Sequence, residues 1–173
     1  MEKQLSRQER ERIQLIQTVI ECAEDLFSQN GYENTTIDAL ATKSEYTKRT
    51  IYRYFVSKED ICFAVMLQGH MRLLEAMREK TSHGQTGYEK IRMVYQAFDE
   101  FFMGNGWLFD LMAHIKYIKS KRNPDELPYF EKYADCLGLI YKEILSLFVM
   151  GHDDQSIRLT LPRGNLPSPL HLS

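Results

Sequence analysis

The sequence predicts an all-α protein in which a short helix-turn-helix unit is joined by a long helix to a C-terminal helical bundle. Apolar side chains recur at three- and four-residue steps along most of the chain, which is the period of an amphipathic helix. No segment within residues 1–150 shows the period-two alternation of a strand. Apolar residues make up 43% of the 173 residues, enough to bury a core in one domain or two small ones.

The first two helices are predicted from their spacing and their end signals. Apolar residues within 13–27 form two neighbouring stripes, so we expect this helix at the centre of a small domain. Gly31 supplies a stop signal, because glycine readily takes the left-handed conformation that ends a helix. Thr35 or Thr36 can then cap a short second helix that runs to about Lys43.

A third helix is expected after a three-residue break. Residues 44–46 interrupt the apolar pattern, and Thr47 is the expected N-cap of a helix that carries Ile51 and Phe55 toward the core. A short helix, a brief break and another short helix are typical of a helix-turn-helix unit.

The rest of the chain continues the helical period. Ser57 and Asp60 form an S-x-x-D capping box that opens a long helix over 57–80. After a loop at 81–87, further helical patterns lie at 91–102, 108–118 and 134–148, with a loop between Pro124 and Pro128. The expected organisation is an N-terminal unit over 1–56, a helical domain over 57–150, and an irregular, truncated or altered tail over 151–173.

The formal charge of −2 conceals a local basic patch. Residues 43–58 carry five cationic side chains against a single carboxylate. The cationic residues are Lys43, Lys48, Arg49, Arg53 and Lys58, and the carboxylate is Glu45. Because acidic residues are concentrated elsewhere, this patch suits a polyanionic partner despite the net charge.

Composition also bears on the compartment. The polar N-terminus has no apolar core of a secretory signal, and no apolar run approaches the length of a membrane span. We therefore expect a cytoplasmic protein with no membrane partner. Cys22, Cys62 and Cys136 are far apart within apolar helical patterns, so we interpret them as small core residues and expect neither disulfide nor zinc site.

Residues 35–60, TTIDALATKSEYTKRTIYRYFVSKED, resemble the DNA-binding module of TetR-family transcriptional regulators. The preceding AEDLFSQNGYENTT is similar to that family's first helix and turn. The positions that match the family pattern are Thr36, Ile37, Leu40, Ala41, Thr47, Lys48, Thr50, Ile51, Tyr52, Phe55, Ser57, Lys58 and Glu59.

The resemblance implies binding to a double-stranded DNA operator. A recognition helix that points its N-terminal residues at base edges fits the major groove, so Lys48 and Arg49 are expected to read sequence. Phenol hydroxyls and residues at helix N-termini are expected to contact phosphates. The candidate DNA-binding residues are Thr36, Thr47, Lys48, Arg49, Tyr52, Arg53, Tyr54 and Lys58.

Two residues depart from the family pattern. The family usually has glycine where Glu45 stands, and a left-handed backbone there would cost another residue roughly 1 kcal/mol. We therefore expect an adjusted turn. A small residue is common where Arg49 stands, so the arginine predicts an extra contact with a base or a phosphate.

For the C-terminal helices the resemblance implies a homodimer whose bundle encloses a pocket for a small-molecule effector. Effector binding would shift the long helix and spoil the spacing of the two recognition helices, which must match about 34–36 Å in B-DNA. An apolar or aromatic effector is implied, although such stripes are more often plain core. The candidate lining residues are Met71, Phe98, Phe102, Trp107, Leu111, Met112 and His114.

The last helix has two apolar stripes. The main one includes Leu137 and Tyr141, and the second consists of Cys136, Ile140 and Leu147. Two covered sides suit a helix that lies between its own core and a partner subunit.

The sequence also bears on two other classes of protein, an enzyme and an adaptor. The sequence has no HExxH motif, nucleophile elbow or glycine-rich phosphate loop, and we expect no enzyme and no cofactor. The adjacent His152, Asp153 and Asp154 cannot converge on one metal ion. A helical adaptor, or a ligand-less regulator that acts through protein contacts, stays open as the alternative.

Overall fold

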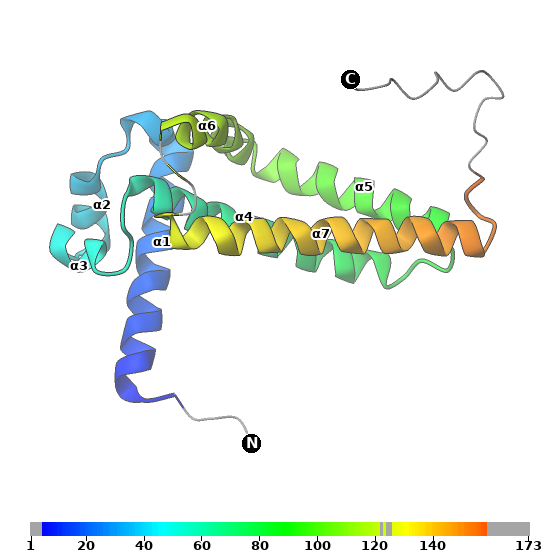
Figure 1. Cartoon of the computed structure of the whole chain (residues 1–173), viewed down its shortest axis with the longest axis horizontal. Helices are drawn as coiled ribbons and strands as arrows, with labels where there is room; N and C mark the ends of the chain where they lie inside the picture. The colour runs from blue at the N-terminus through cyan, green and yellow to red at the C-terminus, as the bar shows by residue number, and fades with distance from the viewer. Residues whose placement is uncertain (1–4, 122, 124–125, 159–173) are drawn as a thin grey trace, which may run out of the picture.

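The computed structural model describes residues 5–121, 123 and 126–158, and within them it is entirely helical (Figure 1). The prediction of an all-α fold is therefore confirmed. The helices are α1 (Arg7–Asn34), α2 (Ile37–Ser44), α3 (Lys48–Tyr52), α4 (Lys58–Thr81), α5 (Gly87–Gly104), α6 (Trp107–Lys121) and α7 (Pro128–Asp153). The predicted tail beyond residue 158 lies outside the described residues.

The N-terminal unit is built on α1, which stands crosswise to α4, α5 and α7, with α2 packed against α1 and α3 packed against α2 (Figure 1). Gly31 breaks α1 with a φ of 75°, as the stop signal predicted. The Thr35 hydroxyl is buried and donates to the carbonyls of Leu26 and Gly31, at 3.2 and 2.9 Å. Thr36 caps α2 by accepting from the Ala39 amide at 3.1 Å. Of the two candidate caps, Thr36 has that role and Thr35 anchors the turn.

The C-terminal bundle consists of α4, α5 and α7, which run side by side, while α6 returns toward α1 (Figure 1). Its core holds Leu73, Met77, Val94, Ala97 and Ile140. Because α4 begins directly after the helix-turn-helix unit and forms one wall of the bundle, it connects the two parts.

The last helix differs from the prediction in its start and in the face that it buries. It starts at Pro128. Proline suits the first position of a helix, because the amide hydrogen that it lacks would have no partner within the helix there. Cys136 and Ile140 are buried in the bundle, whereas Leu137 and Tyr141 are exposed. The second stripe therefore holds the buried residues, while the main stripe is largely exposed except for Ile144, which packs against the core.

Residues just beyond the predicted boundary at 150 form part of the bundle. Helix α7 continues to Asp153, and the Asp154 carboxylate accepts from the Gly87 amide at 2.7 Å. The Ser156 hydroxyl accepts from the Tyr88 amide at 3.0 Å. These bonds cap the start of α5 with residues from the far end of the chain.

The three thiols are free, with Cys62 and Cys136 buried and Cys22 partly buried. Among the described residues, no cluster of side chains could hold a metal ion. The helices in that part of the chain are also too short or too polar to cross a membrane.

Candidate functional site

The turn between α2 and α3 is made by a left-handed residue. Glu45 has φ 58° and ψ 20°, and its amide donates to the Thr42 carbonyl. The expectation of an adjusted turn is therefore wrong. Glu45 takes up the left-handed conformation itself.

Helix α3 presents the predicted recognition residues to solvent. The Thr47 hydroxyl caps it by accepting from the Thr50 amide at 3.1 Å. Ile51 and Phe55 are fully buried, as predicted, and fix which side of the helix faces inward. Of the predicted DNA-binding residues, the exposed ones are Thr36, Thr47, Lys48, Arg49, Tyr52 and Arg53.

Lys48 is held by an acidic neighbour on α2. Its Nζ atom lies 2.6 Å from Oδ1 of Asp38, and both side chains are largely exposed. An ion pair in this setting is weak, and a phosphate can compete with it. The Lys48 ammonium therefore lies on the exposed face at the N-terminal end of α3, where it can exchange Asp38 for a phosphate.

Two predicted contacts, Tyr54 and Lys58, are less accessible than the others. Tyr54 is half-buried, and the Arg12 guanidinium lies 5.8 Å from the centre of its ring. The Lys58 ammonium donates to the Glu33 carbonyl at 3.3 Å and lies 4.3 Å from the centre of the Tyr32 ring. Burial lowers the pKa of Lys58. Both residues thus also hold α1 against the end of the recognition unit.

The predicted effector residues do not converge on one cavity. Phe98, Phe102 and Met112 line an apolar cleft of about 760 Å³ between α4, α5, α6 and α7. Trp107, Leu111 and His114 instead lie at a small cavity of about 210 Å³ between α6 and the end of α1. The sequence places these six close together, but successive turns of α6 face different neighbours.

The apolar cleft contains further residues that the sequence analysis missed. They are His70, Leu73, Tyr95, Asp99, Met103, Phe109, Leu137 and Ile140. His70 is buried, with Nδ1 at 2.9 Å from the Met66 carbonyl and its ring edge-on to Tyr133. Burial lowers the pKa of His70, so the neutral ring is favoured. A histidine within an apolar helical run was the only sequence signal for this polar group.

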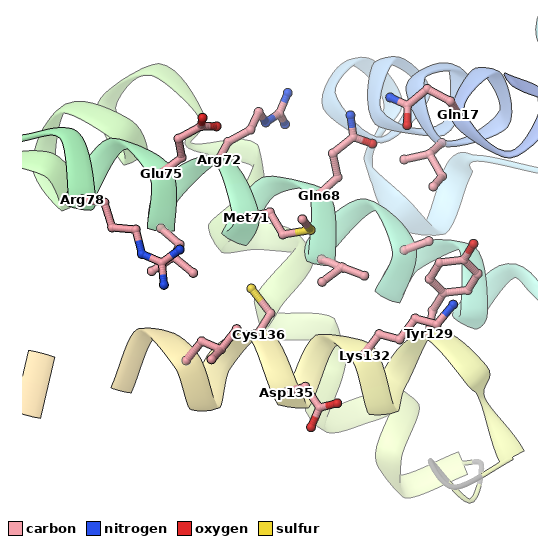
Figure 2. Close-up of a pocket in the computed structure, with 15 residues that line it drawn as sticks. Gln17, Gln68, Met71, Arg72, Glu75, Arg78, Tyr129, Lys132, Asp135 and Cys136 are labelled. Atoms are coloured by element: carbon pink, nitrogen blue, oxygen red, sulfur yellow. The ribbon is translucent and has the colours of Figure 1, made fainter. Parts of the chain in front are cut away.

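Met71, the remaining predicted lining residue, belongs to a different groove of about 940 Å³ between α1, α4 and α7. Figure 2 shows Met71 and Cys136 between α4 and α7, with Arg78 and Lys132 among the charged groups around them. The groove also contains Gln68, whose Oε1 atom is buried and has no hydrogen-bond partner among the described residues. We refer to this cavity as the polar groove and to the previous one as the apolar cleft.

A capped recognition helix after a tight turn, with basic residues on its exposed face, defines a helix-turn-helix DNA-binding unit. Residues 19–65 match the family model described as bacterial regulatory proteins, tetR family. Residues 19–65 therefore form a DNA-binding domain similar to that of TetR-family transcriptional regulators.

Curated relatives are longer than the part that matches. The Fatty acid metabolism regulator protein of Bacillus subtilis is 29% identical over 76 residues, covering 44% of this chain and 39% of the relative. The regulator QacR of Staphylococcus aureus is 24% identical over 131 residues, covering 72% of this chain and 68% of QacR. The chain spans less than half the length of the first curated relatives that it matches.

Solved structures share the fold. The TetR-family regulator PfmR of Thermus thermophilus superposes with a TM-score of 0.62 at 23% identity, over 81% of this chain and 73% of PfmR. FadR of Bacillus subtilis, solved in complex with stearoyl-CoA, gives a TM-score of 0.61 at 23% identity, over 84% and 75% of the two chains.

Proposed function

We propose that the protein is a ligand-responsive transcriptional repressor of the cytoplasm that binds a pseudo-palindromic operator as a homodimer. A small apolar or aromatic effector releases it from the DNA. The observation that carries this proposal is the exposed face of α3, where Lys48, Arg49 and Tyr52 lie beside the Thr47 cap and over a fully buried Ile51. A side-chain set of this kind at a helix N-terminus suits base edges and phosphates.

The apolar cleft is the proposed effector site. Its volume of about 760 Å³ is in the range of small-molecule sites, and aromatic and aliphatic side chains make up most of its lining. FadR of Bacillus subtilis holds stearoyl-CoA in a structure of the same fold, which supports an apolar effector. Because α4 lines this cleft and also follows the recognition unit, an occupant can bias the position of α3.

The proposed dimer surface is the exposed apolar stripe of α7. It consists of Leu137, Tyr141, Leu145 and Phe148, which recur at helical spacing. Exposed apolar patches of this kind mark interaction sites in soluble proteins. A second copy of the chain would supply the two-fold symmetry that a pseudo-palindromic operator requires.

The test is DNA binding by the wild type and a Lys48→Ala/Arg49→Ala/Tyr52→Ala variant, with the DNA that flanks the gene as probe. A matched control, Tyr88→Ala/Arg92→Ala/Lys142→Ala, removes the same residue types from the exposed surface of α5 and α7. We expect tight, salt-sensitive binding by the wild type and the control, and a loss of at least tenfold in the recognition variant.

Failure of this test has a specific meaning. A folded wild type that binds no better than its recognition variant, over the whole salt series, would contradict the repressor proposal. The helical adaptor would then be the better assignment, since the exposed face of α3 would have to serve a protein partner.

A further inference from the structure

Asp60 is a fully buried carboxylate that lies between the recognition unit and the bundle. It occupies the first turn of α4, where its own amide donates to the Ser57 hydroxyl at 3.3 Å. Its Oδ2 atom accepts from the Val56 amide at 3.2 Å, and its Oδ1 atom accepts from the Tyr129 amide at 2.9 Å. Only half of the predicted capping box therefore forms, and the carboxylate serves two other segments.

The bond to Tyr129 caps a second helix. Helix α7 begins at Pro128, and the residue before it, Leu127, supplies no side-chain cap. Asp60 supplies this cap from α4, and a carboxylate is favoured there by the exposed amides and the dipole of the helix. One carboxylate thus lies in the first turn of α4 and at the start of α7.

The two bonds join the segments that matter for the proposed function. Val56 lies four residues after Tyr52, the last residue of α3, and the neighbouring Phe55 ring stacks on Tyr129 with the ring centres 5.3 Å apart. From Tyr129, α7 runs on to Leu137 and Ile140 in the apolar cleft. Tyr129 itself lines the polar groove (Figure 2).

We propose that Asp60 is a positioning residue for the recognition helix, because its carboxylate fixes the segment after α3 to the start of α7. A buried carboxylate that loses one of its hydrogen bonds pays a large desolvation cost. A displacement of α7 that keeps the Tyr129 bond must therefore carry residues 53–57 with it. The effect of Asp60 on DNA binding rests on the proposed function. The joint itself, by which we mean the hydrogen bonds from the Val56 and Tyr129 amides to the Asp60 carboxylate, rests on geometry alone.

Charged groups from α1 and α7 lie near Asp60 and Tyr129. Burial raises the pKa of Asp60, and the two amide bonds together with the nearby Lys132 ammonium oppose this rise. Lys132 lies over the Tyr129 ring at 4.5 Å, and the Arg12 charge from α1 acts on the Tyr129 phenol. Ionisation of Asp60 therefore changes two amide hydrogen bonds at once, in segments about 70 residues apart in sequence.

The first measurement is an NMR titration of the full chain labelled with ¹⁵N-valine and ¹⁵N-tyrosine. We expect the Val56 and Tyr129 amide signals to shift with one shared midpoint above the ordinary aspartate value of 3.8, and both shifts to vanish in Asp60→Asn. The matched control is Ser57→Ala, which removes the cap within α4 but leaves both carboxylate bonds, and it should keep the shared titration. Different midpoints in the wild type, or no titration of Tyr129, would overturn the proposal without any variant.

The second measurement connects the joint to DNA. Asp60→Asn should weaken binding to the DNA that flanks the gene by about tenfold, the size expected for a lost bond to a charged group, and Ser57→Ala by much less. Equal affinity of Asp60→Asn and the wild type would contradict the positioning role. If the wild type does not bind this DNA, the repressor proposal fails, while the shared titration still decides whether the joint exists.

Discussion

At the scale of single residues, the turn before the recognition helix stores strain at Glu45. Its φ of 58° lies in the left-handed region, which costs a residue with a Cβ atom about 1–2 kcal/mol. Glycine avoids this cost but loses more conformational entropy on folding. The strain therefore sets an upper limit on the free energy of unfolding that a glycine at this position can add.

We expect Glu45→Gly to raise the free energy of unfolding by up to about 1 kcal/mol, because relief of strain exceeds the entropy cost. Urea denaturation of both proteins measures the difference. Glu45→Ala serves as the control, since it removes the carboxylate but keeps the strain. If the glycine variant is no more stable than the alanine variant, the left-handed geometry of this turn is not strained in solution.

His70 predicts a pH dependence of stability. Burial lowers its pKa below the ordinary value of 6.5, so the unfolded chain takes up a proton before the native state does. Stability from this group is complete above pH 6.5 and is lost as pH falls toward the lowered native pKa. We expect His70→Gln to show a smaller loss of unfolding free energy between pH 7.5 and 5 than the wild type.

Urea titrations at several pH values measure this loss. His152→Gln is the matched control, because His152 is exposed, and it should retain the pH dependence of the wild type. An identical pH profile for His70→Gln and the wild type would show that His70 is protonated equally in both states.

At the scale of elements, the far end of the bundle depends on two glycines. A Cβ atom on Gly87 would collide with the backbone of Gly151, where α5 and α7 approach each other. We expect Gly87→Ala to destabilise the protein by about 1–3 kcal/mol or more, because neither backbone can move without breaking the Asp154 cap. Thermal or urea unfolding measures the effect.

Gly138 provides the control for this prediction. It lies inside α7, and a Cβ atom there would meet no other atom within 4 Å. Gly138→Ala should therefore stabilise the protein by about 0.5–1 kcal/mol, since alanine is the better helix former. A Gly87→Ala variant as stable as the wild type would mean that α5 and α7 are not in this close contact.

The elements also show what could be predicted from the sequence. Thr47 and Ser57 were predicted as caps, and Thr36 as one of two candidates. All three cap their helices, because a cap and its amide lie three residues apart. The cap of α7 by Asp60 could not be predicted, since it joins residues 69 positions apart. The link between Asp154 and Gly87 spans a similar distance and was missed for the same reason.

The candidate site follows the same division. The exposed residues of α3 were predicted from a local motif, and the structure presents Lys48 and Arg49 to solvent as expected. The effector residues were predicted from aromatic spacing on single helices, and His114 and Met71 lie in cavities other than the apolar cleft. Which face of a helix meets which neighbour depends on packing, and helical spacing alone does not contain that information.

At the scale of the whole molecule, the proposed dimer makes the outer stripe of α7 the element that brings two recognition helices together. Tyr141 is 67% exposed and Leu145 is 48% exposed, although both are apolar in character. A stable interface buries about 800 Å² on each partner, and large apolar or aromatic residues at its centre each contribute about 2 kcal/mol or more. We therefore place these two residues near the centre of the proposed dimer contact.

We expect the wild type to sediment as a dimer and a Tyr141→Glu/Leu145→Glu variant to sediment as a monomer, because two buried carboxylates on each copy would replace the apolar contact. Sedimentation velocity over a range of protein concentrations measures the oligomeric state.

Leu139→Glu is the control: Leu139 is 47% exposed on the same helix but lines the polar groove, and this variant should stay dimeric. A two-fold operator requires both recognition helices, so the monomeric variant should also lose most of its affinity for DNA while it keeps the fold of α1–α3. A wild type that is monomeric at all concentrations, or a Leu139→Glu variant that dissociates while the double variant does not, would move the interface away from this stripe.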